Sequence, residues 1–185
     1  MIVGLIGMSR HGKDTVASAF INNGFKKYSF ADKVKEEFCI IKNITLEELD
    51  KSKQYFRSEL IEFAEGKKTK NKYYWIELIE DNILNDISEG KDIIITDIRR
   101  KEEVLTIMKI RKSLEGYDNV VLFEVNRPLE NGGVFDEDLN TTQGLQYAHY
   151  HNAIDGIIVN NSTHEKLIER SEMIALSLLS NKTNI

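Results

Sequence analysis

The chain has 185 residues, a mass of 21.3 kDa and a formal net charge of −5, which suit one globular domain. It has no apolar run near the roughly 18 residues of a membrane helix, and its single cysteine, Cys39, excludes a disulfide framework and a Cys-rich zinc site. The acidic total predicts no stable nucleic-acid complex. Because no basic stretch precedes the short N-terminal apolar run, we expect no signal peptide and a cytoplasmic protein.

The first half of the chain alternates short apolar runs with helical spacing. Thr45 and Glu48 have the spacing of a capping box, which marks the start of a helix. Gly24 is a plausible end for an earlier one. The elements predicted here, in chain order, are a strand at 2–6, a helix at 13–23, a strand at 27–30, a helix at 32–41, a helix from 45 to 64, a basic turn at 66–72 and a helix at 74–87.

The second half continues the alternation. The apolar run at 92–97 is unbroken, which is typical of a central parallel strand covered on both faces. The order of elements predicts a three-layer α/β fold with right-handed crossovers. The elements are a strand at 92–97, a helix at 101–114, a strand at 119–125, an irregular, partly helical excursion at 127–151, a strand at 154–159, and a helix that Ser162 or Thr163 caps and that runs to 179.

The strongest chemical signal is the segment from Gly7 to Thr15. It has the pattern Gly-x4-Gly-Lys, follows a strand directly and opens a helix, as a phosphate-binding loop does. Glycines let backbone N–H groups turn toward phosphate oxygens, and the helix N-terminus adds further donors. Lys13 can reach the β- and γ-phosphates. The segment therefore predicts an ATP site formed by Gly7, Arg10, His11, Gly12, Lys13, Asp14 and Thr15.

One position of this loop departs from the usual pattern. The residue after the lysine is normally Ser or Thr, and here it is Asp14, with Thr15 following. We expect Thr15 to hold Mg²⁺ directly or through water, with Asp14 as a second candidate. A carboxylate so close to phosphates is tolerable only if it binds the metal, pairs with a cation or points away.

Four segments resemble, in order, those of the phage-type deoxynucleoside monophosphate kinases, and more loosely those of dephospho-coenzyme A kinase and other small P-loop kinases. They include Phe-Ala-Asp-x-Val-Lys and Thr-Asp-Ile-Arg and lie at 7–15, 28–35, 94–103 and 155–162. The resemblance implies a P-loop kinase fold with a central parallel five-stranded sheet, a helical substrate-binding region at about 43–90 and a lid-like segment at about 127–151. It implies ATP-dependent, Mg²⁺-dependent phosphorylation of a nucleoside monophosphate, and some such kinases are homodimers.

Three residues are candidates for the transfer step itself, besides Lys13. Arg99 follows the strand at 92–97, at the sheet edge where ligands of open α/β folds bind, and its guanidinium can grip the acceptor phosphate. Asp97 can hold Mg²⁺ through water, orient Arg99 or cap the following helix. Arg127 begins the irregular segment, where it can stabilise the transferred charge or remain a surface arginine.

Candidates for acceptor binding lie between the second and third predicted strands. The resemblance makes Arg57 a phosphate ligand, and no acid stands three or four residues from it to form a helical ion pair. Lys67 and Lys68 belong to the only dense basic run, near where the resemblance places an arginine. Asp32 can reach the acceptor sugar or cap a helix. Trp75 can stack on a base or fill the core.

Asn160 and Asn161 follow the last strand, at a turn where backbone groups can hold adenine or where ordinary turn chemistry applies. Three other functions remain open at this point. They are a kinase for another small molecule such as dephospho-coenzyme A, a non-catalytic nucleotide-binding switch, and polynucleotide 5′-end phosphorylation. The acidic total argues against the last of these.

Overall fold

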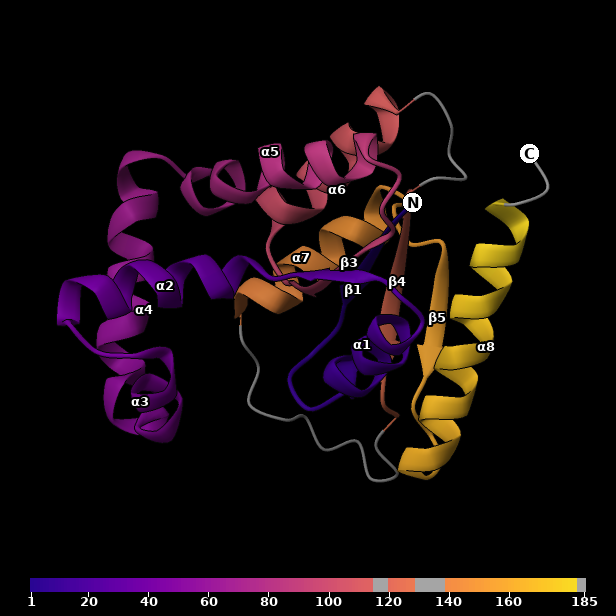
Figure 1. Ribbon diagram of the computed structural model, residues 1–185, viewed down its shortest axis with the longest axis horizontal. Coiled ribbons are helices and arrows are strands. Elements are labelled where there is room, and N and C mark those ends of the chain that lie inside the picture. The colour runs from indigo at the N-terminus through magenta and orange to yellow at the C-terminus, as the bar shows by residue number, and fades with distance from the viewer. Residues whose placement is uncertain (115–119, 129–138, 183–185) are drawn as a thin grey trace.

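A computed structural model describes residues 1–114, 120–128 and 139–182 of the chain (Figure 1). At its centre is a five-stranded sheet in which each strand pairs in parallel with its neighbours. This confirms the predicted α/β fold. The strands, in spatial order, are β2 (Lys26–Tyr28), β3 (Ile93–Ile98), β1 (Ile2–Ile6), β4 (Val120–Asn126) and β5 (Gly156–Val159).

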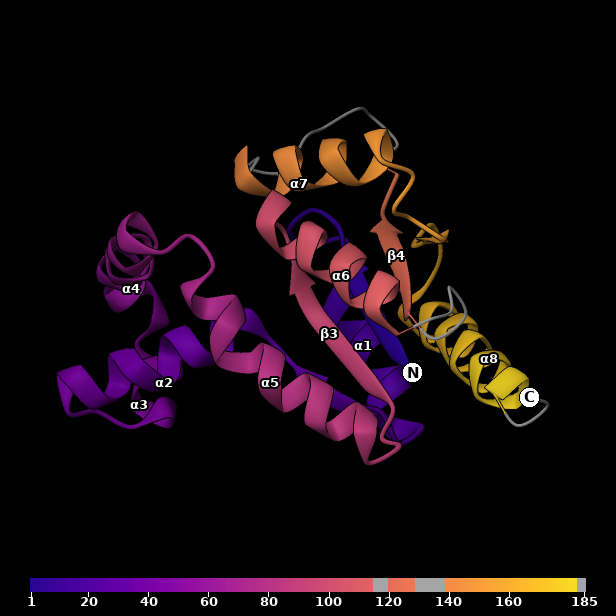
Figure 2. The ribbon, with the colours of Figure 1, turned by 90° about the horizontal axis from the view of Figure 1, so that it is seen from above.

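Helices cover both faces of the sheet and extend beyond one side of it. They are α1 (Lys13–Asn22), α2 (Phe30–Lys42), α3 (Leu46–Lys51), α4 (Lys53–Lys70), α5 (Tyr74–Ser88), α6 (Lys101–Ser113), α7 (Leu139–Tyr150) and α8 (His164–Lys182). Figure 2 shows α1 and α8 on one face and α5, α6 and α7 on the other. In both views α2, α3 and α4 project away from the sheet.

The central strand β1 explains why the predicted strands are so uniformly apolar. Successive side chains of a strand point to opposite faces. Ile2 and Ile6 pack into the core beneath α5 and α6, whereas Val3 and Leu5 pack into the core beneath α1 and α8. All four are completely buried. Both faces of the sheet therefore need apolar residues, and the sequence lacks the alternation of a half-exposed strand.

The capping box predicted at Thr45 is present. The Thr45 side chain accepts from the backbone N–H of Glu48 at 3.2 Å, and the backbone N–H of Thr45 donates to the Glu48 carboxylate at 2.7 Å. The single helix predicted from 45 to 64 is wrong, because α3 ends before Ser52 and α4 begins after it. Serine is a poor residue inside a helix and a good one at its start, which fits a break at this position.

The basic turn predicted at 66–72 is also wrong, since α4 continues to Lys70. Lysine has a high helix propensity, and two of these lysines find acidic partners. Lys67 lies 3.0 Å from Glu37 on α2, and Lys68 lies 3.5 Å from Glu65 one turn earlier. The basic run is therefore the last part of a helix and not a loop.

Within the excursion predicted at 127–151, the structure describes one helix, α7, which confirms that the segment is partly helical. Residues 129–138 lie outside the described residues. The predicted cap of the last helix is Thr163, whose hydroxyl accepts from the backbone N–H of Lys166 at 3.4 Å. Within the described ranges, no helix combines the length and the apolar character needed to cross a membrane.

Candidate active site

The loop between β1 and α1 can close only because two of its residues are glycines. A Cβ on Gly7 would lie 2.4 Å from the carbonyl oxygen of Val125, and one on Gly12 would lie 2.7 Å from Nδ2 of Asn160. Gly12 also has φ near +100°, a left-handed conformation that favours glycine. The loop therefore packs closely against the ends of β4 and β5. The first backbone N–H groups of α1, which follows the loop, have no acceptor within the helix.

Lys13 is buried in this loop, with an exposed fraction of 7%. Its Nζ donates to the carbonyl oxygens of Gly7 at 2.5 Å and Met8 at 2.8 Å. Burial, together with the nearby Arg99, lowers the pKa of Lys13 to about 8, while Asp14 and Asp97 act in the opposite direction. A bound anion would therefore compensate the positive charge of this buried lysine.

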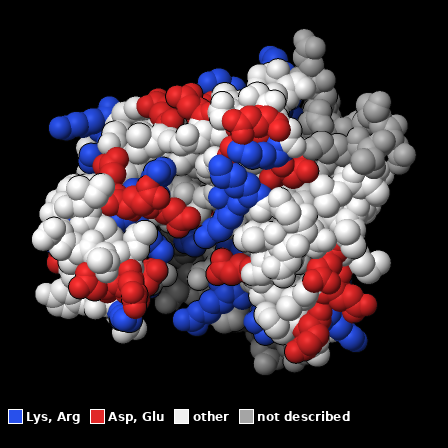
Figure 3. All heavy atoms as spheres, in the orientation of Figure 1, with Lys and Arg blue, Asp and Glu red and all other residues white. Residues whose placement is uncertain are grey.

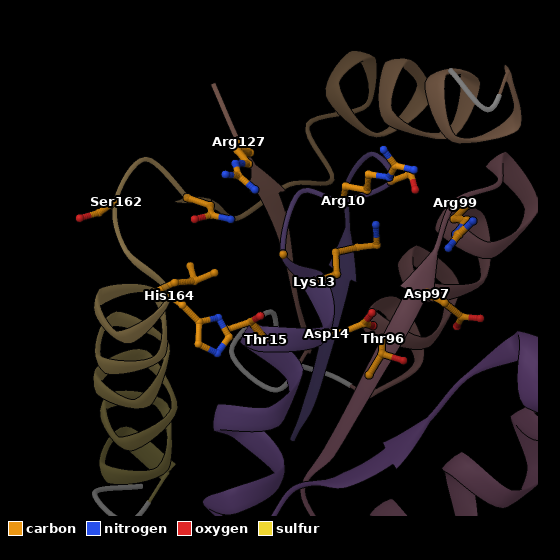
Figure 4. Close-up of a pocket in the computed structure, with 14 residues that line it drawn as sticks. Arg10, Lys13, Asp14, Thr15, Thr96, Asp97, Arg99, Arg127, Ser162 and His164 are labelled. Atoms are coloured by element: carbon orange, nitrogen blue, oxygen red, sulfur yellow. The ribbon is translucent and has the colours of Figure 1, made fainter. Parts of the chain in front are cut away.

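A cavity of about 400 Å³ opens beside the loop (Figure 4). Most of its lining is polar or charged, which suits a phosphate ligand better than an apolar one. The residues that line it are Ser9, Arg10, Gly12, Lys13, Asp14, Thr15, Thr96, Asp97, Arg99, Arg127, Asn160, Ser162, His164 and Leu167.

Four cationic side chains from three separate segments share this cavity. In Figure 4, Arg127 and Arg99 stand on opposite sides of Lys13, and Arg10 lies above it. Arg10 adopts a left-handed backbone conformation with φ of 64°, which is unfavourable for a residue with a side chain. Such conformations concentrate at functional sites. The arrangement brings together positive charges that repel one another until an anion binds between them.

Asp14 and Thr15 line the same cavity from the first turn of α1. A carboxylate and a hydroxyl oxygen are suitable ligands for Mg²⁺, which prefers oxygen donors and keeps several waters. In the described residues no group of three or more His, Cys, Asp or Glu side chains could hold a metal by itself. This donor set therefore suits a metal that is shared with a bound phosphate.

Asp97 has a different role from the helix cap considered from the sequence. Its carboxylate accepts hydrogen bonds from the hydroxyl of Ser29 and the backbone N–H groups of Phe30 and Ala31, each at 2.9 Å. It thus binds the N-terminus of α2, and the alternative that it caps α6 is wrong. Loss of water raises the pKa of the Asp97 carboxyl, and these hydrogen bonds oppose the rise. The carboxylate still reaches the cavity wall.

The cap of α6 comes instead from Glu103, a residue that was not predicted to have a role at the site. Its Oε2 accepts from the backbone N–H groups of Arg99 at 2.7 Å and Arg100 at 2.9 Å. Burial raises the pKa of Glu103 to about 7, with a contribution from Asp97. The signal was available, because a Glu three residues after Arg100 has capping-box spacing at a strand end.

The end of β5 forms another wall. Asn160 donates through Nδ2 to the carbonyl oxygen of His11 at 3.0 Å, so it holds the loop as well as lining the cavity. Asn161 is exposed and lies outside the cavity lining. Ser162 and His164 line the cavity and were not predicted, because nothing in their spacing distinguishes them from ordinary turn residues.

His11 joins the loop to the start of the segment after β4. Its Nδ1 accepts from the backbone N–H of Arg127 at 3.2 Å and lies 3.3 Å from the carbonyl oxygen of Val125. Burial lowers the pKa of His11, which favours the neutral ring that this acceptor role requires. His11 therefore supports the loop without lining the cavity.

Of the residues predicted to bind the acceptor, Arg99 lines this cavity and the others do not. Arg57 is exposed on α4, and Asp32 lies 3.5 Å from Lys27 in an exposed ion pair. Lys67 pairs with Glu37 and the Tyr74 hydroxyl. Among the residues of the described structure that line the cavity, the lysines and arginines are Lys13, Arg10, Arg99 and Arg127.

Lys68 and Trp75 are also outside the cavity. Burial lowers the pKa of Lys68, and Arg100 adds to that effect. Trp75 is 3% exposed, donates through Nε1 to the carbonyl oxygen of Ala64 and packs against Phe63. Of the two roles considered for Trp75, the structure therefore supports core packing. The prediction that Trp75 stacks on a base is not supported, because its ring is buried.

Comparison with known proteins gives one family match. The family model described as phosphomevalonate kinase matches residues 5–113, which is more than half of the chain. The matched range contains the phosphate-binding loop, Asp97 and Arg99. No curated protein matches the chain.

Solved structures resemble the chain at low sequence identity. A dephospho-CoA kinase from Campylobacter jejuni is 13% identical, with a TM-score of 0.58, over 96% of this chain and 96% of that chain. A shikimate kinase from Aquifex aeolicus is 23% identical, with a TM-score of 0.43, over 99% of each chain. The first likeness extends the common architecture over nearly the full length of both proteins.

Proposed function

This chain belongs to the phosphomevalonate kinase family. We therefore propose that it transfers the γ-phosphoryl group of ATP to a small acceptor that already carries a phosphate, and we propose a nucleoside monophosphate as that acceptor. The observation that carries the proposal is the convergence of Lys13, Arg10, Arg99 and Arg127 on one cavity beside a phosphate-binding loop. Phosphoryl transfer depends chiefly on positioning and on neutralising the charge of the reacting phosphates. Four cations in one cavity supply that neutralisation.

The proposed reaction needs no proton acceptor from the protein. An oxygen of the acceptor phosphate attacks the γ-phosphorus, a new P–O bond forms, and the bond to the bridging oxygen breaks so that its electron pair leaves with ADP. Lys13 neutralises the β- and γ-phosphates. Arg99 orients the acceptor phosphate, and Arg127 stabilises the charge that develops on the transferred group.

Asp14 and Thr15 would hold Mg²⁺ bound to the donor phosphates, since both line the cavity next to Lys13. When bound, the ion would supply further neutralisation of the phosphate charge. Asp97 contributes indirectly, because its carboxylate is engaged by the N-terminus of α2.

Donor and acceptor would occupy opposite ends of the cavity. The donor base lies toward Asn160, Ser162 and His164 at the end of β5, and the acceptor lies toward Arg99 at the end of β3. The helices between β2 and β3, over about 43–90, would select the acceptor. The segment at about 127–151 would act as the lid. Arg57, Lys67 and Lys68 belong to these helices and do not line the cavity.

The choice of a nucleoside monophosphate rests on the segments that resemble deoxynucleoside monophosphate kinases. The family match favours a second acceptor, phosphomevalonate, which its name describes as already carrying a phosphate. Both acceptors present a phosphate group to Arg99, so the same cavity chemistry serves either one. A kinase acting on dephospho-CoA is the third candidate.

ADP release with ATP and Mg²⁺ should be measured against a panel of deoxy- and ribonucleoside monophosphates, phosphomevalonate and dephospho-CoA. We expect strong turnover with one or a few nucleoside monophosphates. Turnover only with phosphomevalonate would replace the proposed substrate and keep the reaction. Intact ATP binding with no turnover across the panel would contradict the kinase proposal and favour a nucleotide-binding switch.

A further inference from the structure

The turn formed by Arg99 and Arg100 is held on its N–H side by Glu103. The Glu103 carboxylate accepts both backbone N–H groups through one oxygen, and the side chain is 7% exposed. Two hydrogen bonds to one buried carboxylate fix the peptide planes of the turn more firmly than water can. The direction in which the Arg99 side chain leaves the backbone is therefore set partly by Glu103.

The same turn is held on its carbonyl side by α7. A Cβ on Gly144 would lie 2.0 Å from the carbonyl oxygen of Arg99 and 2.7 Å from its carbonyl carbon. These are backbone atoms, which cannot rotate away as a side chain does. Gly144 is buried in the middle of α7, so the helix lies directly against the Arg99 carbonyl with no side chain between them.

Contacts farther along α7 keep it in this place. Ala148, one turn after Gly144, is completely buried in the core beneath α6. The ring of Tyr147 lies 4.9 Å from Nζ of Lys101, at the start of α6. Nε2 of His149 lies 2.7 Å from a carboxylate oxygen of Glu124 on β4. Figure 2 shows α7 beside α6 along this contact.

We propose that Gly144 and Glu103 are positioning residues that hold the Arg99 turn between α7 and α6 and so set the direction of the Arg99 side chain toward the acceptor phosphate. The inference rests on the proposed function, because it assigns that phosphate to Arg99. It adds a residue of α7, 45 positions away in sequence, which touches neither substrate.

If Gly144 had no positioning role, its replacement by alanine would have the ordinary effect of that change in a helix. In a helix interior, Gly→Ala normally stabilises a protein, because alanine has the higher helix propensity. At Gly144 the added methyl group would meet the Arg99 carbonyl and displace either α7 or the turn. Displacement of a catalytic group by about 1 Å can reduce a rate about a hundredfold.

The test compares Gly144→Ala with Gln146→Ala, an exposed position on the same helix. Inorganic phosphate is titrated into each protein while the side-chain Nε–H resonance of Arg99 is followed by NMR. We expect wild type and Gln146→Ala to respond alike, and Gly144→Ala to bind phosphate about tenfold more weakly. Equal affinity in Gly144→Ala would overturn the inference and leave the proposed function standing. If the Arg99 resonance of the wild type did not respond to phosphate, both the inference and the proposed role of Arg99 would be contradicted.

A second pair of variants guards against misfolding of Gly144→Ala. Glu103→Gln retains an acceptor oxygen for the two N–H groups, whereas Glu103→Ala removes it. We expect Glu103→Ala to raise the acceptor KM about tenfold with the ATP KM within about twofold, and Glu103→Gln to restore most of the loss. A parallel rise of both KM values, or no rescue by glutamine, would indicate a general structural role and overturn the positioning role.

Discussion

The ammonium group of Lys13 is satisfied by its own loop, through the carbonyl oxygens of Gly7 and Met8. A bound phosphate must compete with these carbonyls, so the lysine is held in place before the ligand arrives. Preorganised charge of this kind needs little rearrangement when the reaction takes place. The same burial that fixes Lys13 brings its pKa to about 8.

Lys13→Ala should therefore reduce turnover by about 10²–10³-fold or more, because it removes a cation aimed at the reacting phosphates. ADP release with the best acceptor measures the loss, and circular dichroism should show an unchanged fold. Lys27→Ala is the matched control, since that lysine is exposed and outside the cavity. Normal phosphoryl transfer by Lys13→Ala would remove the loop from the mechanism.

ATP affinity should also depend on pH in a defined direction. Phosphate binds the protonated lysine, and above the pKa of about 8 the free protein must first take up a proton. Affinity should then fall by about tenfold for each pH unit above 8. Calorimetry between pH 7 and 9.5 measures it. Lys13→Arg should abolish the dependence, because arginine stays charged; a slope that persists in this variant would exclude Lys13 as its source.

Glu103 predicts a pH dependence of stability. Its pKa is about 7 in the folded chain, above the value of about 4.3 in an unfolded one. The folded state therefore holds the extra proton between these values, and this contribution to stability is lost as pH rises from about 4.5 to 7. The loss should be about 3–4 kcal/mol. Urea unfolding across this range should show it in wild type and not in Glu103→Gln; parallel curves would contradict the assignment.

At the scale of elements, Asp97 joins two parts of the chain that meet at the cavity. It ends β3, and its three hydrogen bonds hold the N-terminus of α2. A carboxylate at this position also interacts favourably with the helix dipole. The cavity wall and the first of the projecting helices are thus connected by one side chain.

Asp97→Ala should destabilise the protein by about 2–3 kcal/mol, since three donors lose their acceptor. Asp32→Ala is the control. It removes an acid from the same helix turn, but its only ion pair, within the described structure, is an exposed one with Lys27. That change should stay within about 0.5 kcal/mol. Chemical denaturation of both variants provides the comparison, and equal losses would show that the cap contributes little.

The elements that could be predicted from sequence are those with local causes. The loop motif lies between a strand and a helix, and the unbroken apolar runs mark the buried strands. The partners of Asp97 could not be predicted, because Phe30 lies 67 positions away. The lysines after Gly66 were predicted to form a turn, because their ion pairs with Glu37 and Glu65 are seen only in the folded chain. The contact of Gly144 with Arg99 has no local pattern at all.

The chain as a whole carries many charges of both signs, with 25 lysines and arginines and 30 aspartates and glutamates. On the face shown in Figure 3, lysines and arginines are interspersed with aspartates and glutamates. A protein that tracks a nucleic-acid strand instead presents a continuous basic groove. This distribution, together with the net charge of −5, favours a small acceptor over a polynucleotide.

Salt dependence separates these two classes of acceptor. Raising salt from 50 to 200 mM should change kcat/KM for a small acceptor by less than about threefold, whereas strand binding through six or more phosphates would weaken by about 10³-fold or more. Steady-state rates at several salt concentrations measure this, with a 5′-hydroxyl oligonucleotide assayed alongside. Phosphorylation of the oligonucleotide with a steep salt slope would overturn the small-acceptor assignment.

The position of the helices between β2 and β3 has a consequence for how such a protein can evolve. Helices α2 to α5 form one uninterrupted stretch that leaves the sheet at β2 and returns at its neighbour β3. Lys13, Arg99, Arg127 and Asn160 instead lie in segments that follow four different strands. A stretch with adjacent entry and exit points can diverge, lengthen or be exchanged as one unit, while residues gathered from four strands must stay together. With the role proposed for these helices, acceptor choice is the trait most open to evolutionary replacement.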